Sequence, residues 1–244
     1  MHFNAPRPSI HAINITHECM EKISQLILQC STEIGWFCLV TDRSDGPTLF
    51  DVIVLDQRVS PITTEIDEYA IAKFCQYAME APNGVETINA MRCWGHSHVH
   101  MATNPSGQDQ TQMNSFAKQY KPDKTYRLIG NKQGHLRVDI YGPDGNCQQQ
   151  DVGFYLTGTT ITDAQRKEYI AWAKHHIAQY CHPMSWRHPE APKVAATFPA
   201  RPYIVPQENQ KSKTPTHVKE TQQETTKTTK TTPWWRSLWT RLIG

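Results

Sequence analysis

The pattern of apolar and polar positions predicts alternating helices and strands over most of the chain. Between Thr16 and Cys30, apolar residues recur every three to four positions, which is typical of one buried face of an amphipathic helix. Thr16 stands where an N-cap is expected, and Glu18 lies in the first turn. Two β-rich runs, 34–40 and 48–59, surround the turn-forming segment DRSDGP, so we expect a hairpin.

The same alternation continues through the middle of the chain. Residues 65–80 place their apolar side chains on one helical face, and the segment APNG ends the predicted helix. MRCWGHSHVH reads as a strand that runs into a loop, and a helix is expected to open at Ser106. Three short strands, TYRLIGN, HLRVDIYG and DVGFYL, precede a long helix over 162–180. This order predicts an α/β fold in which helices pack on a mixed sheet.

The composition changes after residue 185, which we take as the end of a folded domain, 1–185. Residues 186–232 are rich in Pro, Thr, Lys and Gln and poor in apolar side chains, so they are predicted to be a disordered linker. Residues 233–244 place three Trp within six positions at helical spacing, beside two Arg. Such an amphipathic peptide suits a membrane surface, the groove of a partner protein, or packing on its own domain.

Charge and cysteine content narrow the class of protein. Residues 183–244 carry a net charge of +6 and the remainder −4, so the domain itself is not expected to bind nucleic acid. The seven cysteines lack CxxC spacing and lie in or beside apolar runs, which indicates reduced thiols in the cytoplasm. Without an apolar run near 18 residues or a signal-peptide core, neither membrane spanning nor secretion is expected.

The segment GHSHVHMATNPSGQD, residues 95–109, carries the candidate chemistry. His96 and His98 alternate along a predicted strand and therefore point to the same side, where two imidazoles can converge on one metal ion. The turn signals Asn-Pro and Ser-Gly follow, so the strand is expected to give way to a loop near His100. We therefore expect His100 to be a bystander, or a group that supports a ligand or faces substrate.

Ser106 and Asp109 have two interpretations. At this spacing and at a helix start they match a capping box, in which the hydroxyl and the carboxylate each accept a backbone N–H. Together with the two histidines, however, the carboxylate completes the three protein ligands of a catalytic zinc site, and the hydroxyl can donate to an oxyanion. Such a site also needs a general base, which must come from elsewhere in the chain.

The segment from residue 96 to 109 reads HSH, seven residues, then SGQD, and resembles the HxH-x7-SxxD motif of the JAMM (MPN+) zinc metalloproteases. That family also carries an upstream glutamate, commonly followed by a hydrophobic residue and glycine, and EIG at 33–35 fits this pattern. The resemblance covers about residues 10–182. It implies a JAMM/MPN-like partial barrel of mixed strands flanked by helices.

The resemblance implies a role for each matched position. His96, His98 and Asp109 would hold zinc, Glu33 would deprotonate the zinc-bound water, and Ser106 would support the tetrahedral oxyanion. The implied function is a metalloprotease or isopeptidase whose protein substrate is a conjugate of a ubiquitin-like modifier or an unprocessed C-terminus. The compact chain favours a prokaryotic or phage-type member in the bacterial or host cytoplasm, peripheral to a membrane if the tail binds one.

Two other functions remain open. MPN-like domains also serve as non-catalytic scaffolds or binding modules in larger assemblies, although those usually lack several motif residues that are present here. Hydrolysis of a small-molecule amide is the third function that this site would suit. The metal content of the protein would separate the two hydrolases from the scaffold. Whether a protein substrate is needed would separate the protease from the small-molecule amidase.

Two further features have ordinary explanations. Trp94, beside the predicted ligands, is expected in the core, with a place in the wall of the site as the alternative. A second histidine-rich group matches no common zinc-finger spacing, so we expect helix-end histidines near the C-terminal dipole instead of a structural zinc site. Its members are His175, His176, Cys181, His182 and His188.

Overall fold

The structure is a computed structural model that describes residues 12–119 and 124–190, and the statements below refer to those residues. The predicted linker beyond residue 190 and the Trp-rich peptide 233–244 lie outside them. The elements are β1 (Ala12–Thr16), α1 (His17–Gln29), β2 (Gly35–Arg43), β3 (Gly46–Ile53), β4 (Gln57–Ser60), β5 (Thr63–Ile66), α2 (Glu68–Met79), α3 (Gly84–Ala90), β6 (Cys93–Ser97), α4 (Gly107–Gln119), β7 (Thr125–Gly130), β8 (Leu136–Tyr141), β9 (Cys147–Gln149), β10 (Gly153–Thr157), α5 (Asp163–Tyr180) and β11 (Cys181–Pro183).

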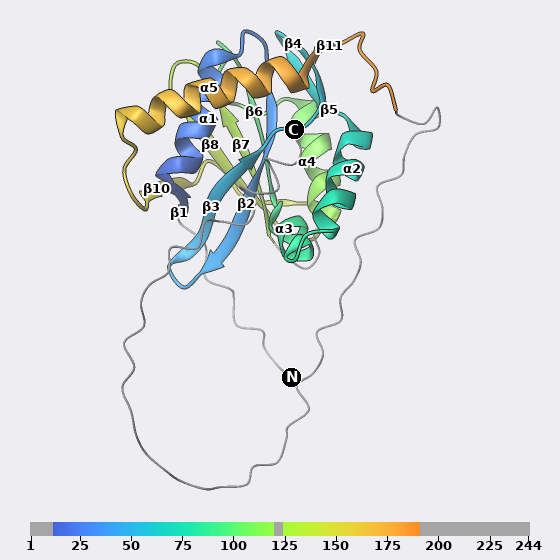
Figure 1. Cartoon of the computed structure of the whole chain (residues 1–244). Coiled ribbons are helices and arrows are strands. Elements are labelled where there is room, and N and C mark those ends of the chain that lie inside the picture. Colours follow the sequence, from blue (N-terminus) through green and yellow to red (C-terminus); the bar gives the residue numbers. More distant parts are fainter. Residues whose placement is uncertain (1–11, 120–123, 191–244) are drawn as a thin grey trace, which may run out of the picture. The chain divides into compact units, whose positions relative to one another are not determined.

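The main sheet has eight strands in the order β10-β1-β3-β2-β6-β7-β8-β9 and curls into a half-barrel (Figure 1). It is mixed, because β1 pairs in parallel with β10 and β3, and β6 pairs in parallel with β7, while the remaining pairs are antiparallel. A second sheet has three strands in the order β11-β4-β5. The predicted α/β fold with a mixed sheet and a partial barrel is confirmed.

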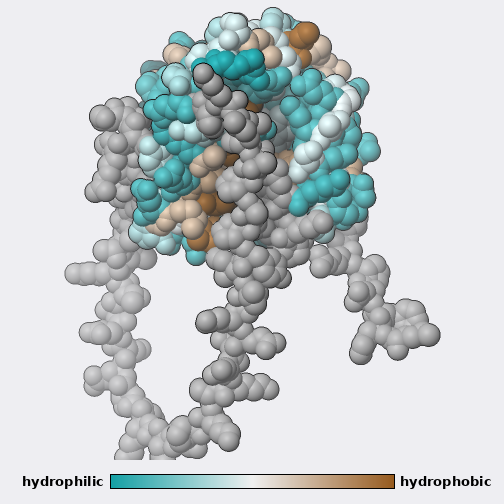
Figure 2. All heavy atoms as spheres, turned by 90° about the vertical axis from the view of Figure 1, so that its right-hand side faces the viewer, coloured by the Kyte–Doolittle hydropathy of each residue, from teal (hydrophilic) through white to brown (hydrophobic). Residues whose placement is uncertain are grey.

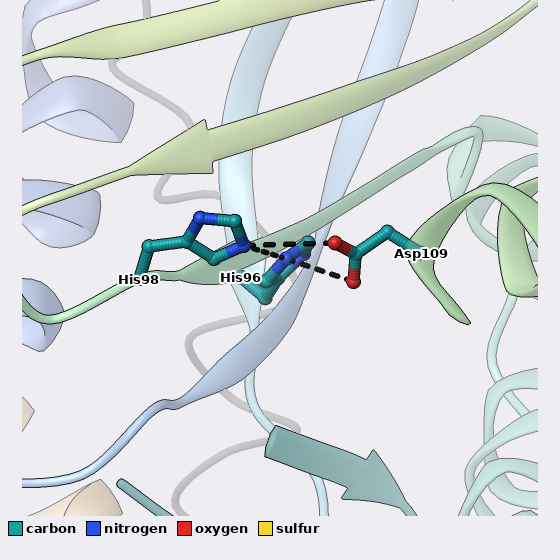
Figure 3. Close-up of side chains that lie close together, drawn as sticks. All are labelled: His96, His98 and Asp109. Carbon is teal, nitrogen blue, oxygen red and sulfur yellow. Dashed lines mark hydrogen bonds and ion pairs between the residues drawn. The ribbon is translucent and has the colours of Figure 1, made fainter. Parts of the chain in front are cut away.

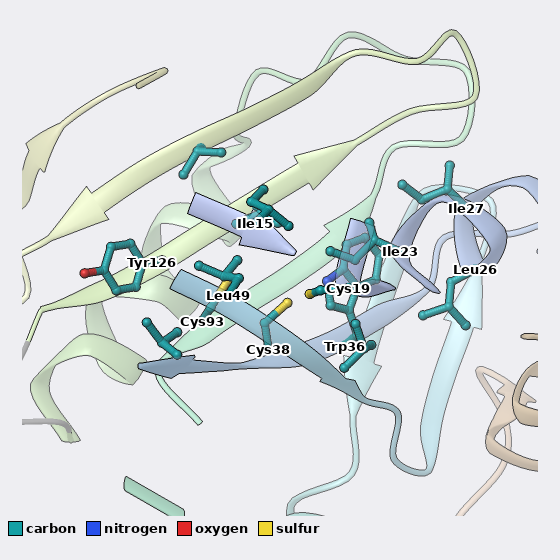
Figure 4. Close-up of a cluster of buried hydrophobic side chains, with 14 of the residues drawn as sticks. Ile15, Cys19, Ile23, Leu26, Ile27, Trp36, Cys38, Leu49, Cys93 and Tyr126 are labelled. Carbon is teal, nitrogen blue, oxygen red and sulfur yellow. The ribbon is translucent and has the colours of Figure 1, made fainter. Parts of the chain in front are cut away.

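Helices cover both faces of the main sheet, and β2 shows how the core is divided between them. Trp36, Cys38 and Val40 belong to one buried cluster, which includes side chains of α1 and α5. Figure 4 shows Trp36 and Cys38 together with side chains of α1. Phe37 and Leu39 belong to a second cluster, which includes side chains of α2 and α4. Because successive side chains of a strand point to opposite faces, the two clusters lie on opposite sides of β2. Strand β2 is therefore apolar on both faces. All five residues of the neighbouring strand β6 are buried as well.

The predicted caps of the first and last helices are confirmed, and the predicted bounds of two other elements are wrong. The first and last helices are capped as expected, since the Thr16 hydroxyl accepts from Cys19 N and Thr162 forms a capping box with Gln165. The run 48–59 is not one strand, because β3 ends at Ile53 and the next strand joins the small sheet. The helix predicted over 65–80 begins only at Glu68, after the capping residue Asp67.

Five short elements were not predicted: β1, β5, α3, β9 and β11. None is longer than seven residues. Strands β1 and β11 pair with strands far away in the chain, whereas β5 and β9 form short hairpins with β4 and β8. A local pattern cannot signal such an element, because the energy that forms it comes from its tertiary partner. Residues 186–190, just beyond the predicted domain boundary, contact the domain, as in the ion pair between Glu190 and Lys73.

The surface is mainly hydrophilic, and the cysteines are not paired in disulfides. Figure 2 shows a mainly hydrophilic face with separate apolar areas. All seven cysteines lie in the described residues and are free thiols. No helix among the described residues is both long and apolar enough to cross a membrane.

A buried ion pair connects the sheet to α4. Arg127 and Asp139 lie opposite each other on β7 and β8, and both are almost completely excluded from solvent. Asp139 accepts from Arg127 Nε at 3.1 Å, and its other oxygen accepts from Arg137 Nε at 2.9 Å and from Asp151 N at 2.8 Å. Arg127 Nη1 in turn donates to Gln110 Oε1, the residue after Asp109, at 3.4 Å. This network fixes the helix that carries a predicted ligand.

Removal of the carboxylate charge from this network should destabilise the domain. We expect Asp139→Asn to lower the free energy of unfolding by about 3–5 kcal/mol, because it leaves a buried guanidinium without its counter-charge. Asp163→Asn is the control, since Asp163 is 95% exposed in its pair with Arg166 and should contribute less than about 1 kcal/mol. Urea denaturation followed by circular dichroism measures both, and equal losses would contradict this account.

Candidate metal centre

Two elements bring His96, His98 and Asp109 together (Figure 3). His96 lies in β6, between β2 and β7 in the middle of the sheet, and His98 follows directly after the strand. Asp109 lies in the first turn of α4. As the alternation of a strand requires, the two histidines point to the same side, and the carboxylate faces them from the helix. All three side chains are buried.

The donor atoms of these three residues lie close together. His96 Nε2 is 3.1 Å from His98 Nε2 and 3.2 Å from Asp109 Oδ1, and His98 Nε2 is 3.6 Å from Asp109 Oδ2. Four-coordinate zinc with ligand bonds of about 2.0–2.2 Å separates its ligand atoms by about 3.3–3.6 Å. The separations therefore suit a small cation with N/O ligands. Within residues 12–119 and 124–190, this is the one group of three or more His, Cys, Asp or Glu that could hold a metal ion.

The hydrogen bond on the far side of His98 supports the same conclusion. Its Nδ1 lies 2.6 Å from the carbonyl oxygen of Ala102, so Nδ1 carries the proton and donates it. In the neutral ring this leaves a lone pair on Nε2, which is the atom that faces Asp109. A histidine that binds a metal commonly donates its other ring N–H to a carbonyl in this way.

Burial and charge act differently on the three groups. Burial lowers the pKa of His96. For His98, burial also lowers the pKa, but the neighbouring Asp109 carboxylate and Ala102 carbonyl outweigh burial and raise it. Burial raises the pKa of Asp109, but the two histidines outweigh burial, so this pKa lies well below its usual range. The carboxylate is therefore ionised, which is the form that a cation requires.

The capping box and the ligand role of Asp109 occur together. Asp109 N donates to Ser106 Oγ at 3.2 Å, and Ser106 N donates to Asp109 Oδ2 at 2.6 Å, which are the two bonds of a capping box. The same carboxylate lies beside both histidines. The two interpretations of this pair are thus compatible, because the cap holds the carboxylate in place. Ser106 is itself exposed and lines the same cavity as the ligands.

Glu33 lies in the wall of that cavity, just before β2, and only 3% of its surface is exposed. Burial raises the pKa of its carboxyl to about 7; His98 lowers this pKa and Asp109 raises it further. Glu33 thus lines the same cavity as His96, His98 and Asp109. A carboxyl with a pKa near neutrality can both accept and release a proton at physiological pH.

The backbone around Glu33 is fixed by three different partners. Glu33 N donates to Ser60 O at 2.9 Å, and Ile34 N donates to Ser97 Oγ at 3.1 Å. Gly35 N donates to the side chain of Gln57 at 2.7 Å. Because Ser97 lies between the two histidines in the sequence, its bond to Ile34 joins the segment that follows Glu33 to the end of the strand that carries His96.

Gln57 is a structural contributor that the sequence did not reveal. It is fully buried, and its amide makes hydrogen bonds to both the N–H and the carbonyl of Gly35, at 2.7 and 2.9 Å. It also accepts from the hydroxyl of Thr64 at 2.8 Å, which joins β5 to the same point. Nothing in the local sequence indicates that a glutamine inside a β-rich run will bind the backbone of a distant residue.

The cavity around these residues has a volume of about 320 Å³. Its other walls are mainly neutral polar side chains from β5, the 98–106 loop and α4, with apolar side chains at the rim, and the described residues that line it include no Lys or Arg. The polar members are Thr63, Thr64, Asn104, Gln108 and Gln112, and the apolar members include Ile62, Trp94 and Met101. Ile62, at the turn between β4 and β5, is 75% exposed.

His100 lies apart from the ligands. It is exposed and does not line the cavity, although it is only two residues from His98. The strand ends at Ser97, and the backbone turns after His98, so the alternation that joins His96 and His98 does not extend further. This position agrees with the expectation of a bystander.

The remaining candidates occupy the positions expected of structural residues. Trp94 is buried in the second core cluster, and its ring also lies 4.7 Å from the ring of His96, so it is both core and cavity wall. His182 and His188 contact Asp56, with nitrogen to oxygen distances of 3.0 and 3.6 Å. His176 Nδ1 donates to the Trp172 carbonyl within its own helix, at 2.7 Å.

Comparisons with known proteins give little guidance. No family model matches the chain, and no curated protein matches it. A solved structure that resembles it is the solution structure of a protein from Desulfitobacterium hafniense, with 17% sequence identity over 63% of this chain and 97% of that chain. The TM-score is 0.37, which is too low to support an argument about this protein.

The two histidines of one short segment should differ in their effect on metal binding. We expect His98→Ala to weaken binding of a divalent cation by more than about 100-fold, because it removes a direct ligand, whereas losses of supporting groups typically cost 10–100-fold. His100→Ala is the matched control and should leave the affinity unchanged. Calorimetric titration with Zn²⁺ measures both, and equal affinities for the two variants would contradict the proposed ligand set.

Proposed function

We propose that the protein is a zinc-dependent hydrolase of amide bonds of the JAMM (MPN+) type. The observation that carries this proposal is the position of a buried glutamate, Glu33, in the same cavity as a buried group of two histidines and one carboxylate. Three protein ligands leave one coordination position of zinc for water or substrate, and a separate carboxylate can then handle the proton. A purely structural zinc site would instead have four protein ligands.

Each residue of the site has a distinct task in this proposal. Zinc would supply a Lewis acid that polarises the scissile carbonyl and brings the pKa of water to about 7. Glu33 removes a proton from the attacking water and delivers one to the leaving amine, which is the work of a general base and then a general acid. The hydroxyl of Ser106 accepts one hydrogen bond from Asp109 N and keeps its own proton for the developing oxyanion.

The walls of the cavity support a polypeptide substrate. Strand β5 is an edge strand of the small sheet, and Thr63 and Thr64 of this strand line the cavity. An extended chain could pair with this edge through its backbone, as peptides do on other exposed strands. Ile62 and Met101 line the cavity and are both exposed, so they offer apolar contacts to such a chain. We therefore favour a protein substrate, such as a ubiquitin-like conjugate or a protein C-terminus, over a small amide.

Replacement of the base should separate metal binding from catalysis. We expect Glu33→Gln to retain zinc and lower the turnover number by about 10²–10⁴-fold, because proton transfer loses its carboxylate while the three ligands remain. Zinc content is measured by atomic absorption, and turnover is measured on a panel of lysine isopeptide and peptide amide substrates with and without a chelator.

Glu86→Gln is the matched control, because Glu86 is an exposed glutamate of α3 and should leave both zinc content and turnover unchanged. Full turnover by Glu33→Gln would exclude Glu33 as the base. Zinc-loaded wild-type protein without activity on any amide of the panel would favour the scaffold function instead.

A further inference from the structure

The loop that begins at His98 is held by the turn between β7 and β8. Each of the four successive residues 98–101 makes a hydrogen bond to this turn or to the end of β7. The bonds are His98 N to Gly130 O at 2.9 Å, Lys132 N to Val99 O at 2.8 Å, Gln133 Nε2 to His100 O at 3.0 Å and Asn131 Nδ2 to Met101 O at 2.9 Å. The first four residues of the loop are therefore all bound to this turn or to the end of β7, although β6 has already ended.

The backbone of this loop adopts an unfavourable conformation at one residue, so these hydrogen bonds are needed to stabilise it. Val99 has a φ of 40°, in the left-handed region that β-branched residues rarely adopt. Such conformations persist where surrounding contacts over-determine them, and they are frequent at functional sites. Val99 directly follows His98, so relaxation of this residue would change the direction of the ligand.

Asn131 is the side chain that joins the turn to the loop. It is almost completely buried, and its Oδ1 accepts from Gln133 N at 3.1 Å and His135 N at 3.0 Å, which closes its own turn. Its Nδ2 donates to Met101 O at 2.9 Å and to Gln133 Oε1 at 2.8 Å. One amide thus shapes the turn with its oxygen and binds the ligand loop with its nitrogen.

The bond from Asn131 lies one residue from the atom that orients His98. Met101, whose carbonyl accepts from Asn131, directly precedes Ala102, whose carbonyl is 2.6 Å from His98 Nδ1. Met101 N also donates to His98 O at 2.7 Å. The position of the Ala102 carbonyl decides how the imidazole is rotated, and hence whether Nε2 faces Asp109.

We propose that Asn131 is a positioning residue of the metal centre, which acts by holding the 98–102 loop so that the imidazole of His98 points at the shared metal position. The inference rests on the metal centre of the proposed function. Asn131 does not line the cavity that contains His96, His98 and Asp109. Its effect is transmitted through the carbonyls of Met101 and Ala102.

Asn131→Asp tests this role, because it separates the two functions of the amide. The carboxylate keeps the oxygen that accepts from the turn and loses the N–H₂ that binds Met101 O. Its negative charge would by itself attract a cation, so a purely electrostatic effect would tighten metal binding. The positioning role predicts the opposite sign, a loss of about 10–100-fold in affinity.

Asn146→Asp is the charge-matched control. Asn146 also belongs to a turn, between β8 and β9, but its side chain donates to Asp144 within that turn, at 2.8 Å. It should leave metal binding unchanged. Co²⁺ is the probe in both cases, because its visible absorption reports the ligand geometry as well as the affinity, and circular dichroism checks that each variant is folded.

A second variant removes another bond to the loop through an exposed side chain. Gln133→Ala removes the donor to His100 O and should weaken Co²⁺ binding by about fivefold, since a single net hydrogen bond contributes about 1 kcal/mol. Because Gln133 is exposed, this change should leave folding intact even if Asn131→Asp does not fold.

Weaker Co²⁺ binding and an altered spectrum in Asn131→Asp, with wild-type behaviour in Asn146→Asp, would support the positioning role. Wild-type affinity in both Asn131→Asp and Gln133→Ala would overturn it while leaving the metal centre and the proposed function intact. Failure of the wild-type protein to bind Co²⁺ or Zn²⁺ would overturn the metal centre, and with it both proposals.

Discussion

The close approach of two imidazole nitrogens and a carboxylate inside the protein is the constraint on which the rest of the site depends. His96 Nε2 and His98 Nε2 are 3.1 Å apart, and Asp109 lies beside both. Burial of an ionised carboxylate is costly unless a positive partner offsets it. A bound cation would satisfy all three groups at once, which explains why the domain would keep such a group beneath its surface.

Three different segments must be held in register for this contact, and each is fixed by buried polar groups. The capping box with Ser106 fixes Asp109, and the Asn131 turn fixes the loop after His98. Gln57 and Ser97 fix the segment that begins with Glu33. The segment of Glu33 and the loop after His98 are thus supported from opposite sides of β6, so the apolar core and the hydrogen bonds at the strand ends act together to set the geometry.

The sequence predicted the parts of this site that follow from local rules, and the fold supplied the others. Strand alternation was sufficient to pair His96 with His98, the turn signals after Val99 were sufficient to separate His100, and helix-start spacing was sufficient to place Asp109 near Ser106. Gln57 and Asn131 were missed because their importance lies in backbone groups of residues distant in the chain, which no local period encodes. The short strand β11 was missed for the same reason, since its pairing partner β4 lies far away in the chain.

The most direct test of the account is X-ray absorption spectroscopy at the zinc edge of the zinc-loaded protein, which identifies the atoms bound to the ion. The account predicts four light-atom neighbours at about 2.0–2.2 Å, with the outer-shell scattering of two imidazoles and no sulfur. Mutation of His98 should reduce the imidazole contribution to one, and mutation of His100 should leave it at two. Sulfur at about 2.3 Å, or a spectrum that changes with His100 and not with His98, would contradict the central claim.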